Sequence, residues 1–134
     1  MKQKHFFLLL VILSISLLSC SDGPINKITF QNLAAGDVLI NFRGSQIEVL
    51  SQSTAVLEDI DKGEYEYETI FSIPFGATEF GSEGDISGTF IVKAGTKIIV
   101  TYTSVLSEGK YTIYTSVTNS NDLTEGILPD PIGN

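Results

Sequence analysis

The sequence predicts an all-β domain, an antiparallel β-sandwich of seven or eight strands, with a small β-barrel as the alternative. From residue 25 onward apolar residues recur at every second position, which is the period of a strand with one buried face. Glycine, proline and aspartate divide this region into short segments, as turns divide the strands of a sandwich. The same region lacks a helical apolar spacing, so helices are not expected in the domain.

The first half of the domain is expected to contain four strands and a hairpin. In the second strand Val38, Ile40 and Phe42 share one face. Gly44-Ser45 predicts a two-residue type II′ turn after it, because glycine readily takes the positive φ of the first central position. The expected strands are 29–33, 38–43, 46–50 and 54–58, with further turns at 34–37 and 59–63.

The fifth expected strand, 64–73, combines an aromatic face with an acidic one. Pro74 ends it, since proline has no amide hydrogen for the ladder of a central strand. We expect the aromatic face to point to the core and the acidic face to solvent. The first face holds Tyr65, Tyr67, Thr69, Phe71 and Ile73, and the second holds Glu64, Glu66, Glu68, Ile70 and Ser72.

Residues 75–85 have no strand pattern and are expected to form the longest irregular segment inside the domain. Periodicity is lost again from residue 119 to 134, so this tail is expected to be extended or disordered. The domain is therefore assigned to residues 28–118. Between the two irregular segments the expected strands are 86–93, 96–105 and 110–117, with tight turns at Ala94-Gly95 and Glu108-Gly109.

The first nineteen residues have the pattern of a helical export signal. Two lysines in the first five residues precede an apolar run at 6–18 that only two serines interrupt. These thirteen residues are too few to cross a bilayer core of ~30 Å, which takes about 20. Polar residues at helical spacing are missing between Phe6 and Leu13, which argues against a buried amphipathic helix. Residues 1–19 are therefore predicted to be removed.

The segment ends in Leu17-Leu18-Ser19-Cys20, with an apolar residue three positions before the cysteine and a small residue directly before it. This arrangement resembles the signal of bacterial lipoproteins, the lipobox. The resemblance implies that Cys20 receives a diacylglyceryl group through a thioether and that a signal peptidase cuts before it. A disulfide within the chain would need a second cysteine, and a catalytic thiol would need a nearby base. Cys20 is the only cysteine, and the only histidine, His5, lies in the removed segment.

The same resemblance implies where the protein is located. The new amino terminus of such proteins is also acylated, and two or three acyl chains hold a protein firmly on a bilayer. In the best-known sorting system an aspartate directly after the cysteine retains lipoproteins in the inner membrane, and here Ser21 stands in that position. We therefore expect the outer membrane of a Gram-negative cell. Asp22 is a single acidic residue of the kind that some lineages read as a surface-export cue, so the periplasmic and surface faces both stay open.

Charge limits the partners of the mature chain. Removing residues 1–19 takes away two of the eight basic residues, which leaves six against sixteen acidic ones and a net charge near −10. This acidity argues against nucleic acid and against electrostatic adhesion to anionic lipid. The expected partners are the membrane, through Cys20 and a tether at residues 20–27, and a protein of the cell envelope.

The residue inventory argues against an enzyme. The chain after residue 19 lacks histidine, tryptophan, methionine and any thiol other than Cys20. Serine–histidine, cysteine–histidine and zinc hydrolysis are thereby excluded, and the glycines between residues 76 and 84 match no phosphate-binding spacing. The expected function is a non-enzymatic structural or protein-interaction role, with a calcium- or glycan-binding module as the alternative.

A calcium site would use the acidic turn, with Asp59, Asp61 and Glu64 as candidate ligands. The spacing fits an EF-type loop poorly, because Gly63 stands where a third ligand is needed. A cation is not required by the neighbouring glutamates either. Carboxylates about 6.8 Å apart on one strand face repel by only roughly 0.6 kcal/mol in water. A solvated glutamate face is the preferred interpretation, and no cofactor is expected other than this possible calcium.

The segment 75–85 is the second candidate binding site, since loops on rigid scaffolds often carry binding residues. Its phenylalanines could instead pack on the edge of the sandwich. A carboxylate-only hydrolase is a further alternative, disfavoured by the small scaffold and by the lack of tryptophan to stack on a sugar. The candidate residues are Phe75, Glu79, Phe80, Glu83 and Asp85.

The stretch STAVLEDIDKGEYEYET, residues 53–69, consists of an apolar strand, a turn and a Gly-x-Tyr strand. It resembles the corresponding passage of transthyretin-like and collagen-adhesin B-type surface modules. The resemblance covers seventeen residues and includes no functional residue. It therefore implies a β architecture and nothing about activity.

Overall fold

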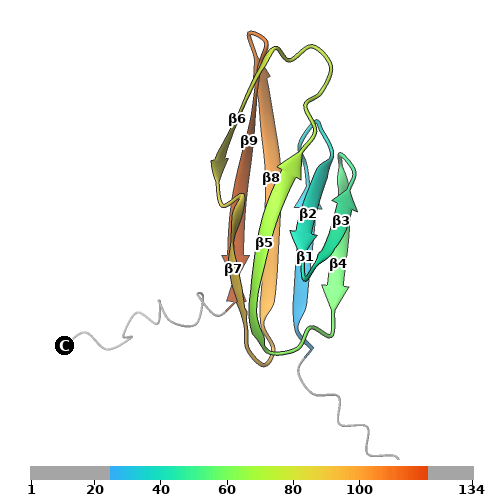
Figure 1. Ribbon diagram of the computed structural model, residues 1–134, viewed down its shortest axis with the longest axis vertical. Helices are drawn as coiled ribbons and strands as arrows, with labels where there is room; N and C mark the ends of the chain where they lie inside the picture. The colour runs from blue at the N-terminus through green and yellow to red at the C-terminus, as the bar shows by residue number, and fades with distance from the viewer. Residues whose placement is uncertain (1–24, 121–134) are drawn as a thin grey trace, which may run out of the picture.

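The computed structural model describes residues 25–120, and the elements that it places there are nine β-strands (Figure 1). The signal segment 1–19, Cys20, most of the tether and the tail from residue 121 lie outside the described residues. No helix among residues 25–120 is long and apolar enough to cross a membrane. The strands are β1 (Lys27–Asn32), β2 (Val38–Phe42), β3 (Ser45–Val49), β4 (Ser53–Glu58), β5 (Gly63–Phe71), β6 (Glu79–Gly84), β7 (Ser87–Val92), β8 (Lys97–Ser107) and β9 (Lys110–Asn119).

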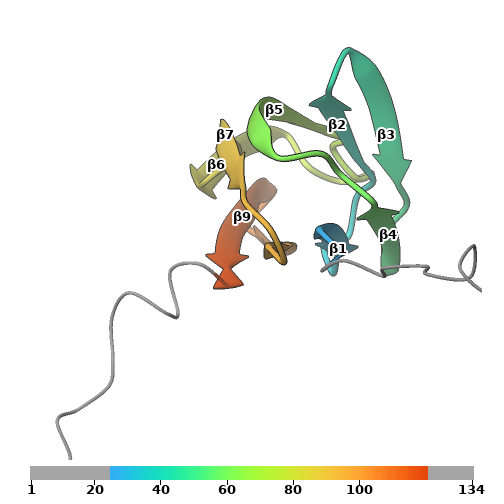
Figure 2. The same ribbon diagram turned by 90° about the horizontal axis from the view of Figure 1, so that it is seen from below.

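The all-β prediction is confirmed, and the strands form two sheets. One sheet has the order β4-β1-β8-β9-β6 and the other β3-β2-β5-β7. Each sheet ends in two edge strands, and the view along the long axis shows two layers rather than a closed ring (Figure 2). The barrel alternative is therefore wrong, and the arrangement is sandwich-like. The prediction of purely antiparallel pairing is also wrong, because β1 pairs with β8 and β6 pairs with β9 in parallel.

The eight expected strands all have counterparts, and β6 is the additional one. It lies inside segment 75–85, so the prediction of an irregular segment there is wrong. The chain runs along β9 as β6, bends at Gly84, and continues as β7 in the other sheet. Gly84 has a φ of 87°, and a Cβ at this position would overlap the carbonyl oxygen of Thr115. Only glycine fits this bend, which lets one extended run of chain serve both sheets.

The hairpin turns follow the twist of the strands. The predicted type II′ turn at Gly44-Ser45 is wrong, because Ser45 already pairs with Phe42 and the two central residues are Arg43 and Gly44. Both have a positive φ, 53° and 73°, which defines a type I′ turn. The predicted turn at Glu108-Gly109 is confirmed, with φ values of 52° and 81°.

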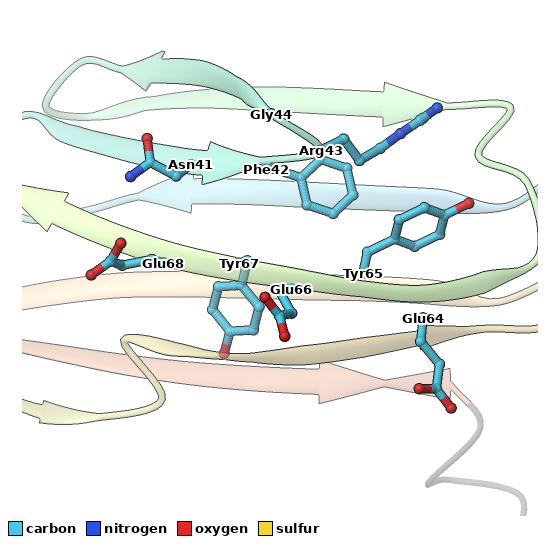
Figure 3. Close-up of a pocket in the computed structure, with 9 residues that line it drawn as sticks. All are labelled: Asn41, Phe42, Arg43, Gly44, Glu64, Tyr65, Glu66, Tyr67 and Glu68. Atoms are coloured by element: carbon cyan, nitrogen blue, oxygen red, sulfur yellow. The ribbon is translucent and has the colours of Figure 1, made fainter.

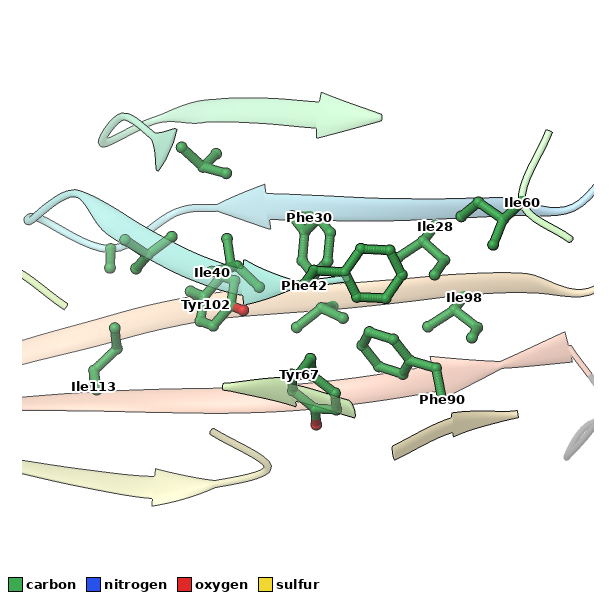
Figure 4. Close-up of a cluster of buried hydrophobic side chains, with 14 of the residues drawn as sticks. Ile28, Phe30, Ile40, Phe42, Ile60, Tyr67, Phe90, Ile98, Tyr102 and Ile113 are labelled. Atoms are coloured by element: carbon green, nitrogen blue, oxygen red, sulfur yellow. The ribbon is translucent and has the colours of Figure 1, made fainter. Parts of the chain in front are cut away.

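The core lies between the sheets and combines aliphatic side chains with a cluster of aromatic rings (Figure 4). Phe30 from one sheet packs against Phe42 and Phe90 from the other, with ring centroids 6.4 and 6.3 Å apart. Tyr67 stacks on Phe90 at 4.0 Å. A hydrogen bond of 2.8 Å between the hydroxyl groups of Thr69 and Tyr102 also joins the two sheets. These contacts form because each strand turns its alternate apolar residues inward, as the period of two predicts.

The predicted faces of β2 and β5 are confirmed. Val38, Ile40 and Phe42 of β2 are buried, and so are Tyr67 and Thr69 of β5. Glu64, Glu66 and Glu68 are exposed. The expected strand 64–73 is two residues too long, since β5 ends at Phe71 and Ile73 is exposed.

Candidate functional site

The acidic face of β5 lies beside a shallow groove at the end of the β2–β3 hairpin. The register places Glu68 beside Asn41 and Tyr67 beside Phe42, so β2 and β5 form the floor together. The groove has a volume of about 480 Å³ (Figure 3). Its lining residues are Asn41, Phe42, Arg43, Gly44, Glu64, Tyr65, Glu66, Tyr67 and Glu68.

The charged side chains of this groove do not converge on one point. Figure 3 shows Glu64, Glu66 and Glu68 spread along the strand. The Arg43 guanidinium carbon lies 5.4 Å from the centre of the Tyr65 ring, which is a cation–π contact. Within residues 25–120 the only ion pair within 4.0 Å joins Lys27 and Glu58, at 3.9 Å. The groove is thus a solvated acidic surface with no arranged set of reacting groups.

Burial changes the pKa of two tyrosines beneath this face. It raises the pKa of Tyr67 to about 12, and the Asp85 carboxylate adds to this rise. The Tyr67 hydroxyl also donates a hydrogen bond of 3.0 Å to the backbone carbonyl of Asp85. Burial raises the pKa of Tyr102 to about 12 as well. Both groups are neutral at physiological pH and act as core side chains, not as acids or bases.

The predicted metal ligands are not brought together. Asp59 lies in the turn before β5 with a φ of 55°, and Asp61 accepts a hydrogen bond of 2.8 Å from the Tyr65 hydroxyl through its backbone carbonyl. The side chains of Asp59, Asp61 and Glu64 are exposed. In the described part of the chain no group of three or more acidic, histidine or cysteine side chains is placed to hold a metal ion.

The predicted binding segment is divided between two faces of one sheet. Phe80 pairs with buried Tyr111 on the core-facing side of β6, and its ring lies 6.3 Å from that of Phe71. Glu79 and Glu83 occupy the opposite side, in register with Lys110 and Tyr114.

The two glutamates are four residues apart, which is about 13 Å along a strand. That separation exceeds the roughly 5 to 9.5 Å of a glycosidase carboxylate pair. Asp85 follows β6, and Phe75 lies in the turn before it. The five candidates therefore do not form one site.

The feature that sequence reasoning missed is an apolar surface at one end of the molecule, which we call the distal tip. It consists of Ile73, Phe75, Phe80 and Leu106, which are 45%, 105%, 63% and 49% exposed. Leu106 and Phe80 both pair with Tyr111, so they extend the core-facing side of the five-stranded sheet. They stay partly exposed because they lie at the end of the opposite sheet, where Phe71, the last residue of β5, still contacts the Phe80 ring. The only sequence signal was the phenylalanine between Pro74 and Gly76, where a turn would ordinarily be polar.

The segment that carries Phe75 is held at both ends. The Ser72 amide donates a hydrogen bond of 2.8 Å to the carbonyl of Asp37. The Thr78 and Glu79 amides both donate to the carbonyl of Gly109, at 2.7 and 3.2 Å. The exposed phenylalanine is therefore presented on a braced turn next to the β8–β9 hairpin.

A hollow of about 510 Å³ lies beside the distal tip, on the outer side of the β8–β9 hairpin. Two carboxylates, from Glu79 and Glu108, and one ammonium group, from Lys110, line it. The remaining lining residues are Val105, Ser107, Thr112 and Tyr114. This charged surface lies on the face of the five-stranded sheet opposite Phe80 and Leu106.

The described chain begins and ends at the other end. Lys27 pairs with Lys97 at the start of β8, and Asn119 pairs with Ile98. The hairpin turn that bears the distal tip follows the last residue of β8, about 33 Å away along an eleven-residue strand. Figure 1 shows the first and last strands leaving at the bottom, while the β8–β9 hairpin and the β5–β6 connection form the top.

No protein-family model matches this chain, and no curated protein matches it significantly. Function is therefore inferred from the residues and their arrangement.

Proposed function

We propose that this chain is a lipid-anchored protein of the bacterial cell envelope whose β-sandwich domain has a non-enzymatic interaction role. The single observation that carries the proposal is Leu17-Leu18-Ser19-Cys20 at the end of a thirteen-residue apolar run. Cleavage before Cys20 would leave this residue about five positions from the first described residue, Ile25. The domain is then held at the β1 end, with the distal tip at the opposite end.

A binding role is supported by what the domain exposes. The carboxylates of β5 lie along an open strand face, and the braced turn with Phe75 presents a large apolar side chain to solvent. Natural soluble domains rarely leave several large apolar side chains together at one end unless another molecule covers them. A protein-interaction role therefore accounts for the exposed residues better than a purely structural one.

The proposal is tested by substituting Cys20→Ser in the full chain, expressed in a Gram-negative cell that is fed a fatty-acid analogue. The natural chain should be labelled and recovered with the outer membrane, and the variant should be unlabelled precursor. Ser21→Ala is the matched control, because it leaves the cysteine and the residue before it unchanged, and it should still be labelled. Equal labelling of the natural chain and the Cys20→Ser variant would refute the proposal.

A sorting variant tests the choice of membrane. Ser21→Asp places an aspartate directly after the cysteine and should move the labelled protein to the inner membrane. Labelled Ser21→Asp protein that stays with the outer membrane would contradict the reason given for this location.

A further inference from the structure

A crevice opens between the two sheets along the edge where β3 and β4 meet. These are edge strands of opposite sheets, joined by the turn at residues 50–52, and Figure 2 shows them on the same side of the sandwich. The core-facing side of β3 is buried at Val49, next to this turn, half-buried at Ile47 and exposed at Ser45. The two sheets therefore separate with distance from the turn. The hollow between them has a volume of about 430 Å³.

Core-facing side chains of both sheets form the walls of this crevice. Phe42 and Ile47 come from the four-stranded sheet. Leu57 comes from β4, where it pairs with buried Ile28, and Ile60 lies in the turn that follows. All four lining residues belong to the hydrophobic core or pack against it, so the crevice is an opening into the core. Apolar walls that water can reach are energetically unfavourable unless another apolar group covers them.

One unpaired cation stands at the mouth of the crevice. Arg43, the only arginine of the chain, lines the crevice from the turn between β2 and β3. Its guanidinium carbon lies 5.4 Å from the centre of the Tyr65 ring, and that ring lies 5.7 Å from the ring of Phe42. Both rings pack in the core, and Figure 3 shows the three side chains together at this end of β2. The guanidinium therefore lies on the same side of the sheet as the apolar walls.

The charges at the mouth favour a ligand with a single negative charge. The other charged lining residue, Glu58, is paired with Lys27, and this is the only ion pair within 4.0 Å among residues 25–120. Arg43 thus has no carboxylate partner within the described domain. A guanidinium binds a carboxylate through two parallel hydrogen bonds. A phosphate monoester would bring nearly two negative charges close to Glu58, so a carboxylate fits the mouth better.

The walls determine the rest of the ligand. The side chains of Phe42, Ile47, Leu57 and Ile60 have no polar atom, so a peptide between them would leave amide groups facing apolar surface. An unbranched hydrocarbon chain has no such groups. A volume of about 430 Å³ is roughly fourteen times the ~30 Å³ that one water molecule occupies in the liquid, and a methylene group is of similar size. The crevice thus suits a chain of roughly ten to fourteen carbons.

We propose that this crevice binds a fatty acid, whose hydrocarbon chain lies between Phe42, Ile47 and Leu57 and whose carboxylate accepts hydrogen bonds from Arg43. The inference goes beyond the proposed function and does not depend on the anchor at Cys20, because every residue that carries it lies in the β-sandwich domain.

The test uses dodecanoic acid with a photoreactive diazirine at the end of its hydrocarbon chain, added to envelopes of cells that make the full chain. Illumination should attach the probe within residues 42–60, at the side chains that line the crevice. The matched probe, in which a hydroxyl group replaces the carboxylate, should label this region at least fivefold less. Excess unlabelled dodecanoate should compete with the acid probe, whereas dodecyl phosphate at the same concentration should compete at least fivefold less.

Two variants separate the charge from the shape of the crevice. Arg43→Gln should reduce labelling by the acid probe at least fivefold. Lys62→Gln is its matched control, because it removes the same charge from an exposed position nearby that does not line the crevice, and it should label like the natural chain. Ile47→Phe narrows the crevice and keeps Arg43, so it should also reduce labelling.

Four results would each overturn the proposal: adducts only outside residues 42–60, equal labelling by the acid and hydroxyl probes, equal labelling of Arg43→Gln and Lys62→Gln, or undiminished labelling of Ile47→Phe. A thermal melt of each variant guards against loss of folding, and Ile47→Phe keeps the proposal testable should Arg43→Gln melt early. Fatty-acid labelling of Cys20 is a separate readout outside residues 42–60. Loss of either signal therefore refutes one proposal and leaves the other.

Discussion

Asn32 offers the sharpest test of how the fold supports the distal tip. Its side chain is fully buried and makes three hydrogen bonds. It donates to the carbonyls of Gly36 and Val49 at 3.0 and 2.9 Å, and it accepts from the Ala34 amide at 3.0 Å. These bonds shape the β1–β2 turn, which in turn contacts the base of the β8–β9 hairpin. The Gly36 amide donates to the Tyr111 hydroxyl at 3.3 Å, next to Leu106 and Phe80 in the register.

Asn32→Ala should lower the free energy of unfolding by about 3 kcal/mol, because each of three buried hydrogen bonds contributes about 1 kcal/mol. For a domain of roughly 100 residues this corresponds to a fall of about 12 to 24 °C in Tm. The assay is urea denaturation followed by the near-ultraviolet signal of the tyrosines. Asn41→Ala is the matched control, since Asn41 lies on the outer face of β2, and its effect should stay within about 0.5 kcal/mol. A loss below about 1 kcal/mol for Asn32→Ala would refute this account of the turn.

Three further predictions concern the bend, the core and the acidic face. Gly84→Ala should cost at least about 1 kcal/mol more than Gly44→Ala in urea denaturation, because both have a positive φ but only Gly84 meets the Thr115 carbonyl; equal costs would contradict this. The raised pKa of Tyr102 means that its phenol loses its proton more readily in the unfolded chain than in the folded one. The stability that the neutral phenol contributes is therefore complete below pH 10 and is lost as the pH rises to about 12. Stability should fall by about 3 kcal/mol over that range through Tyr102 and by a similar amount through Tyr67, whose pKa burial also raises to about 12, so Tyr102→Phe should keep about half of the decline and the full decline in this variant would be inconsistent with this cause. Glu66→Lys should stabilise the fold by about 1 kcal/mol at low salt by relieving repulsion along β5, and a gain that persists in 1 M salt would rule out that explanation.

The parts of the fold that depend on local burial could be predicted from the sequence. In β5 the alternation of tyrosine and glutamate reports directly which face is inside, and the structure buries Tyr67 and exposes Glu66 accordingly. The turn at Glu108-Gly109 was equally clear, because two strands of matching period flank it. Such features depend on a residue and its near neighbours in the chain.

The parts that depend on strands distant in sequence could not be predicted. β6 pairs with β9 through backbone hydrogen bonds. Apolar and polar residues alternate in β6 no more than they do in a loop, and the strand contains Gly81 and Gly84. The parallel pairing of β6 with β9 is possible because the chain changes sheets at a bend after β6. The need for glycine at this bend comes from the close approach of Gly84 to Thr115. The exposure of Leu106 follows from the different lengths of two sheets. A pattern read along one strand carries no information on where its partner ends.

The candidate site was likewise predictable only in the part that depends on neighbouring residues in the chain. The sequence drew attention to segment 75–85 and named Phe75 and Phe80, both of which belong to the distal tip. It grouped them with Glu83 and Asp85, which lie further along the chain towards the bend into β7. Leu106 was absent from the grouping because it is more than 20 residues away in sequence and is brought close only through the pairing of β6, β9 and β8.

The central claim is that Cys20 anchors this domain to a membrane, and the intact mass of the mature protein tests it most directly. Protein extracted from the envelope of its own cells should begin at Cys20 and carry a diacylglyceryl group with a further acyl chain on the amino terminus. A chain that still begins at Met1, or one that begins elsewhere with an unmodified Cys20 or without it, would contradict the claim.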